Sequence, residues 1–108
     1  MDETLFQPDL LASRTALVTG GATGIGQAIS RRLGQLGAQV VIASRNPESL
    51  AAAAAGFAAD DGLDIAWKRL DVRDDAMVKA VFDEVAETHG GLDILINNAA
   101  GNFFCPTA

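Results

Sequence analysis

The chain has 108 residues, of which 49% are apolar and 20% are charged, and its formal net charge is −6. This length suits one small domain with a core of its own. The acidic balance disfavours binding to nucleic acid or to an anionic membrane surface, so we expect neither as a partner. An anionic ligand can still bind where arginines and helix N-termini gather locally.

The sequence shows neither a membrane span nor a secretory signal, and it contains one cysteine. No apolar run approaches the roughly 18 residues of a membrane span, and the N-terminus lacks the pattern of a secretory signal. The single cysteine, Cys105, cannot form an internal disulfide, which fits a reducing cytoplasm. We therefore expect a cytoplasmic protein, and we assign no residue to a metal site.

The elements alternate between strand and helix along the chain. Residues 1–13 are expected to form a surface arm, and residues 14–108 form the folded segment. Strands are predicted over 14–20, 39–43, 65–70 and around 92–96. Helices are predicted over 24–36, from 47 until residues 60–62, and from Asp74 or Asp75 until Gly90. Short connections and right-handed crossovers predict an α/β fold with a parallel sheet in the order 3-2-1-4, half of a doubly wound sheet.

Local signals support the helices. Asn46 is predicted to cap the second helix, and Leu50, Ala54 and Phe57 to form its apolar stripe. In the first helix, Gly34 predicts close packing, because glycine there costs about 1 kcal/mol relative to alanine. Arg31 and Arg32 of that helix are expected on its solvated side, and Gly37 at its C-cap. The third helix has a clear apolar face, formed by Met77, Val78, Val81, Phe82 and Val85.

The first strand runs into a glycine-rich turn. Residues 19–26 read Thr-Gly-Gly-Ala-Thr-Gly-Ile-Gly and open the first helix. Strand, glycine turn and helix form a typical nucleotide-phosphate site, because glycines admit a pyrophosphate and the helix N-terminus binds anions. The glycine spacing differs from G-x-G-x-x-G, and no P-loop Lys-Ser or Lys-Thr follows. A tight turn of any α/β protein is the alternative.

The end of the second strand indicates which cofactor would bind. An acid at this place selects NAD through the ribose hydroxyls, whereas an arginine pairs with the 2′-phosphate of NADP. This chain has Arg45 there, between Ser44 and Asn46. The alternative is a solvated arginine at a helix start, where its charge matches the helix dipole poorly.

The third and fourth strands also end in polar residues. Asp71 is predicted to accept a hydrogen bond from an adenine amino group beside Val72, with a helix N-cap as its alternative role. Asn98 is predicted to lie near the ribose, and 99–101 to let the cofactor pass over a small backbone. Asn97 is expected to hydrogen-bond across the sheet. An ordinary Asn/Gly turn is the alternative for this segment.

Together these motifs resemble the short-chain dehydrogenase/reductase family over roughly residues 12–108. The extended form Asn97-Asn98-Ala99-Ala100-Gly101-Asn102-Phe103 is similar to the 2,4-dienoyl-CoA reductase branch, which uses NADPH. The resemblance implies a Rossmann-type site for NADP(H). The residues assigned to that cofactor are Gly20, Ala22, Thr23, Gly24, Ile25, Gly26, Ser44, Arg45, Asn46, Asp71, Val72, Asn98, Ala99, Ala100 and Gly101.

The resemblance also implies a substrate and an activity. Arg73 and Phe103 match positions that touch the acyl-CoA; a surface salt bridge and core packing are their alternatives. The implied reaction is NADPH-dependent reduction of an unsaturated acyl thioester in fatty acid metabolism. Reduction of a 3-oxoacyl thioester is an alternative within the family, and a catalytically inactive nucleotide-binding fragment is another.

The catalytic acid implied by the resemblance is a tyrosine with a nearby lysine, beyond the fourth strand. The 108 residues contain no tyrosine. We therefore expect that the chain is cut at Ala108, that it holds no catalytic residue, and that the complete form is a homo-oligomer.

Overall fold

Four parallel strands form one sheet in the order β3-β2-β1-β4 in the computed structural model, which describes residues 11–22 and 24–98. The strands are β1 (Thr15–Thr19), β2 (Gln39–Ser44), β3 (Ala66–Arg69) and β4 (Ile94–Asn97), and the helices are α1 (Gly24–Gln35), α2 (Pro47–Asp61) and α3 (Asp75–His89). The predicted α/β fold and strand order are confirmed, and the element bounds shift by one or two residues.

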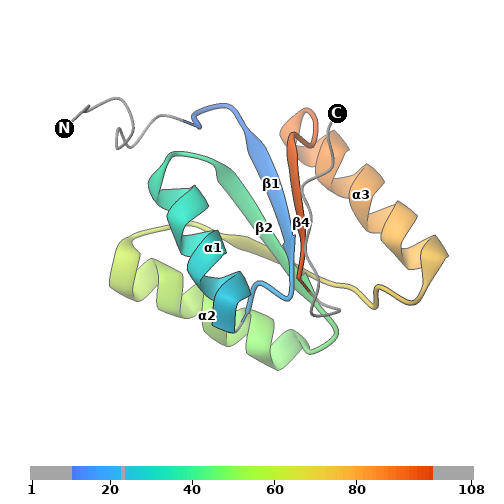
Figure 1. Cartoon of the computed structure of the whole chain (residues 1–108), viewed down its shortest axis with the longest axis horizontal. Coiled ribbons are helices and arrows are strands. Elements are labelled where there is room, and N and C mark those ends of the chain that lie inside the picture. The colour runs from blue at the N-terminus through green and yellow to red at the C-terminus, as the bar shows by residue number, and fades with distance from the viewer. Residues whose placement is uncertain (1–10, 23, 99–108) are drawn as a thin grey trace.

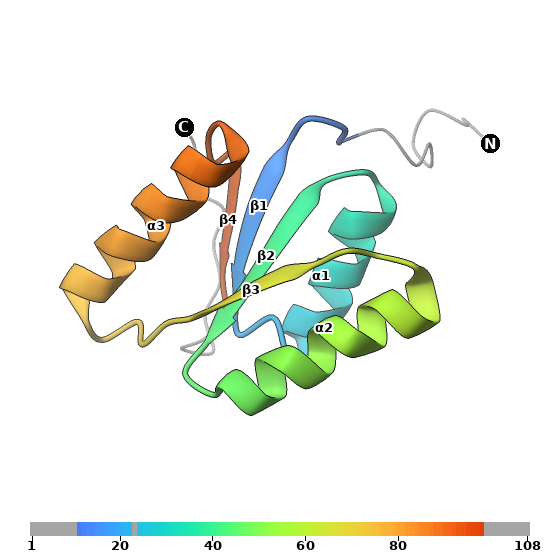
Figure 2. The ribbon, with the colours of Figure 1, turned by 180° about the vertical axis from the view of Figure 1, so that it is seen from behind.

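The helices cover both faces of the sheet. Figures 1 and 2 show α1 and α2 on one face and α3 on the other. In β1, Ala16 and Val18 pack into the core beneath α1 and α2, whereas Leu17 packs into the core beneath α3. The middle of β1 (residues 16–18) and the middle of β2 (residues 40–43) are apolar and buried, as expected of strands covered on both faces.

Two expectations about helix faces are corrected. The buried stripe of α2 is Leu50, Ala53 and Phe57, and Ala54 is only partly buried. Arg31 is half-buried rather than solvated: its Nε donates to Asp61 Oδ2 at 2.7 Å, and its guanidinium carbon lies 5.4 Å from the centre of the Phe57 ring. A long side chain can pack its stem on apolar surface while its charge reaches an acid, so Arg31 bridges α1 and α2.

The predicted helix ends and the close approach at Gly34 are confirmed. The Asn46 side chain accepts hydrogen bonds from the backbone N–H groups of Glu48 and Ser49, at 2.9 and 3.3 Å. Gly37 follows α1, and its N–H donates to the Gly34 carbonyl. A Cβ added at Gly34 would lie 3.0 Å from Leu63 Cδ1. These contacts define the start of α2, the end of α1 and the packing of α1 against Leu63.

Within the described ranges, no helix combines the length and the apolar character needed to cross a bilayer.

The core beneath α2 gives a stability test. We expect Leu50→Ala to lower the free energy of unfolding by about 2–5 kcal/mol, because Leu50 is fully buried and its truncation leaves a cavity. The reverse change at the exposed neighbour, Ala51→Leu, should alter the free energy of unfolding by no more than about 0.5 kcal/mol. Urea denaturation of both variants measures the difference. Equal losses would show that α2 does not pack on the sheet through this face.

Candidate functional site

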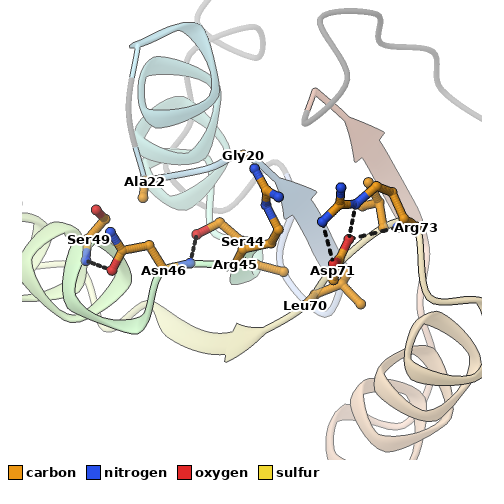
Figure 3. A pocket seen from close by; sticks show the side chains of 11 residues that line it. Gly20, Ala22, Ser44, Arg45, Asn46, Ser49, Leu70, Asp71 and Arg73 are labelled. Carbon is orange, nitrogen blue, oxygen red and sulfur yellow. Dashed lines mark hydrogen bonds and ion pairs between the residues drawn. The ribbon is translucent and has the colours of Figure 1, made fainter.

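The carboxyl ends of the parallel strands meet at one edge of the sheet. The Gly20 N–H donates to the Ala43 carbonyl and the Leu70 N–H to the Ser44 carbonyl, both at 2.7 Å, so the strand ends stay linked beyond the ladder. A cleft of about 490 Å³ opens there (Figure 3). It is lined by Gly20, Ala22, Ala43, Ser44, Arg45, Asn46, Ser49, Leu70, Asp71, Val72 and Arg73.

The glycine turn brings the start of α1 close to the end of β1. Gly20 has a φ of 68°, in the left-handed region that favours glycine. A Cβ added at Gly26 would lie only 2.0 Å from the Gly20 carbonyl oxygen, so backbone packs directly on backbone. The first turn of α1 holds no acidic residue. This arrangement can present helix N–H groups to an anion beside the cleft.

Arg45 lies on the cleft wall at the end of β2. Figure 3 shows it beside Ser44 and Asn46, across from Asp71 and Arg73. Its side chain is exposed, and within the described part of the chain no hydrogen bond or ion pair holds its guanidinium. The Asn46 side chain accepts hydrogen bonds from the first turn of α2, which it caps. Arg45 is therefore available to an anionic ligand in the cleft.

Asp71 and Arg73 form a fork at the opposite side. Arg73 Nε donates to Asp71 Oδ1 at 3.1 Å, Arg73 Nη2 donates to Oδ2 at 3.0 Å, and the Arg73 backbone N–H also donates to Oδ1. These hydrogen bonds lower the pKa of Asp71 from 3.8 to about 2, and the charge of Arg45 adds a smaller effect in the same direction. The carboxylate is thus ionised throughout the neutral range.

The alternative considered for Asp71 is the N-cap of α3, and the alternative considered for Arg73 is a surface ion pair. The N-cap of α3 is Asp74, whose side chain accepts from the Met77 N–H, so the N-cap role considered for Asp71 is wrong. The surface ion pair considered for Arg73 is present, with its partner inside the same cleft.

A hydrogen-bond network joins the ends of β4 and β1. Thr19 Oγ1 donates to Asn97 Oδ1 at 2.8 Å and accepts from the Asn98 N–H at 2.9 Å. The cross-sheet role predicted for Asn97 is confirmed. The Asn98 side-chain nitrogen would lie 3.0 Å from a Cβ at Gly26, so Asn98 lies against the start of α1.

The cleft gathers many of the predicted residues but not all. Lining it are Gly20, Ala22, Ser44, Arg45, Asn46, Asp71, Val72 and Arg73, whereas Gly24, Ile25, Gly26 and Asn98 do not line it. Thr23, Ala99, Ala100, Gly101 and Phe103 lie outside the described residues, as does the arm over residues 1–10.

Three lining residues were missed by the sequence reasoning. Ala43 and Leu70 are apolar residues at or near strand ends, and a search of every strand terminus would have found them. Ser49 lies in the first turn of α2, near the Asn46 cap.

The fork predicts an acid titration with a low midpoint. The Asp71 carboxyl should titrate near pH 2 by carbon NMR, and Arg73→Gln should return the midpoint toward 3.8. Because the folded pKa is lowered, the contribution of this pair to stability is full above pH 3.8 and is lost as the pH falls through about 2. A midpoint near 3.8 in the unsubstituted chain would show that no fork forms in solution.

Known proteins resemble this chain in sequence and in structure. A peroxisomal 2,4-dienoyl-CoA reductase of Danio rerio, named as (3E)-enoyl-CoA-producing, is 44% identical over 102 residues, covering 94% of this chain and 34% of that protein. A citronellol catabolism dehydrogenase of Pseudomonas aeruginosa PAO1 superposes with a TM-score of 0.78 at 33% identity, covering 89% of this chain and 40% of the other. The L-sorbose reductase of Gluconobacter frateurii, complexed with NADPH and L-sorbose, superposes with a TM-score of 0.74 at 34% identity, covering 82% of this chain and 34% of the other.

The chain spans about a third of the length of the curated relatives that it matches. The family model described as short chain dehydrogenase matches residues 14–108, nearly the whole chain. With the parallel sheet and the glycine turn, this match shows that the chain belongs to the short-chain dehydrogenase family and that, among its curated relatives, it is similar to 2,4-dienoyl-CoA reductases.

Proposed function

We propose that the cleft binds the adenosine end of NADPH, and that the complete protein is an NADPH-dependent reductase of unsaturated acyl thioesters. The observation that carries this proposal is the position of Arg45. Its guanidinium lines a cleft formed by the strand ends, with no acid at the end of β2 to accept the ribose hydroxyls. An arginine there favours a 2′-phosphate over a bare ribose.

The other cleft residues have compatible roles. The N-terminus of α1 would stabilise the pyrophosphate, and Gly20, which lines the cleft, would let it approach the backbone. In the Asp71–Arg73 fork, Oδ1 accepts two hydrogen bonds and Oδ2 accepts one. Since each carboxylate oxygen has two lone pairs, Oδ2 can still accept a hydrogen bond from an adenine amino group. Asn98 would approach the ribose from β4.

The substrate class is proposed from the relatives. Curated relatives from an animal and a bacterium are named as 2,4-dienoyl-CoA reductases. When bound, NADPH would supply a hydride to the conjugated acyl thioester, and a proton delivered to carbon would complete the reduction. Arg73 has guanidinium donors beyond those in the fork and would pair with a phosphate of the acyl-CoA. Phe103 would form a wall of the acyl slot.

Assembly and location belong to the same proposal. We place the folded unit at residues 14–108, the complete protein in a homo-oligomer, and its reaction in the cytoplasm. The name of the Danio rerio relative gives a peroxisomal location for that protein, so cell fractionation of the complete protein tests the location directly.

A charge reversal at Arg45 tests the cofactor. We expect Arg45→Asp to weaken NADPH binding about 10- to 100-fold more than NADH binding, because hydrogen bonds to a charged group contribute about 1.5–3 kcal/mol. Isothermal titration of both cofactors gives the two affinities. The control is Lys79→Gln, which removes a cation from the exposed face of α3, where Lys79 pairs with Asp83. Equal losses for NADPH and NADH would exclude the 2′-phosphate contact.

An activity assay of the complete protein tests the substrate. We expect NADPH oxidation with a 2,4-dienoyl-CoA to be faster than with a 3-oxoacyl-CoA of the same chain length, as followed by NADPH absorbance. A faster reaction with the 3-oxoacyl-CoA would assign the protein to ketone reduction. Binding of NADPH without turnover of either substrate would favour a nucleotide-binding role.

A further inference from the structure

The cleft contains a carboxylate beside the place where a phosphate is proposed to bind. Asp71 and Arg45 line the same cleft, and the charge of Arg45 lowers the pKa of Asp71, so the two groups interact electrostatically. A phosphate held by Arg45 would therefore lie within the field of an ionised carboxylate. At physiological ionic strength this repulsion extends over about 8 Å.

Arg73 is placed to cancel that repulsion. It is the second residue after Asp71, and its side chain folds back to give two parallel hydrogen bonds, one to each carboxylate oxygen. The backbone N–H of Arg73 adds a third. Fork geometry of this kind is specific to arginine, because its planar guanidinium matches both oxygens of a carboxylate.

We propose that Arg73 is a specificity-determining residue, which neutralises Asp71 and so allows the cleft to prefer a nucleotide with a 2′-phosphate. This inference rests on the proposed NADPH site. It adds that the preference depends on the charge balance of Asp71 and Arg73 as well as on Arg45. Asp71 can then serve the adenine without repelling the phosphate.

Charge balance predicts opposite effects for the two partners. Arg73→Gln leaves the Asp71 charge uncompensated, and we expect the ratio of NADPH affinity to NADH affinity to fall about three- to tenfold. Asp71→Asn releases a cation in the cleft and should raise the ratio. The double variant restores the net charge of the cleft, and its ratio should return close to that of the unsubstituted chain. Both residues are at the surface of the cleft, so the fold should tolerate these changes.

The ratio of NADPH affinity to NADH affinity distinguishes neutralisation of Asp71 by Arg73 from direct contacts of either residue with the cofactor. Loss of an adenine contact at Asp71 affects NADPH and NADH alike, because both carry adenine, and it therefore cancels. If Arg73 instead contacts the phosphate itself, the double variant stays as low as Arg73→Gln alone. Arg73→Lys keeps the charge without the fork and should retain most of the preference.

The experiment is isothermal titration of NADPH and NADH into the chain and its four variants, Arg73→Gln, Asp71→Asn, their double and Arg73→Lys, at low and high salt. Opposite shifts in the single variants, recovery in the double, and convergence at high salt support the proposal. An unchanged ratio in Arg73→Gln, or a double variant without recovery, overturns it. If the unsubstituted chain shows no NADPH preference, or one that Arg45→Asp leaves intact, the proposed NADPH site itself fails.

Discussion

The contact between Gly26 and the Gly20 carbonyl is the constraint on which the site depends. A Cβ added at Gly26 would lie 2.0 Å from that oxygen, which is too close for any side chain, so only glycine allows α1 to begin this close to β1. The same approach places Gly26 against Asn98 at the end of β4, while the Gly20 N–H remains bonded to β2. One backbone contact therefore ties three strand ends and a helix start into one arrangement.

A chain with a net charge of −6 can still form a local site for an anion, because the cleft has its own charge balance. Arg45 and Arg73 both line it, and Asp71 is the one acidic side chain among its lining residues. Two guanidinium groups against one carboxylate leave the cleft positive. Other acids of the described chain pair outside the cleft: Glu84 and Asp83 of α3, for example, pair with Lys68 and Lys79.

The sequence predicted the sheet well because its signals were local. The apolar run of β2 indicates a strand that is covered on both faces, and Asn46 followed by Pro47 is a local signal for the start of α2. Predictions were weaker where two residues of one kind competed. Asp71 and Asp74 are both good N-caps, and only the tertiary structure shows that Asp71 is bound by Arg73 while Asp74 caps α3. Likewise, Ala53 and Ala54 have equal propensity, and the packing of α2 on the sheet decides which is buried.

The residues at the starts of the three described helices differ in charge, and this difference indicates that an anion binds at the start of α1. All three helices follow parallel strands and begin at the same edge of the sheet (Figures 1 and 2). The first turn of α2 contains Glu48 after the Asn46 cap, and that of α3 contains Asp75 after the Asp74 cap. These side chains already stabilise the positive ends of their own helix dipoles. The first turn of α1 has no acid, so no side chain of that turn offsets its dipole, and the dipole favours a negative charge from outside the helix.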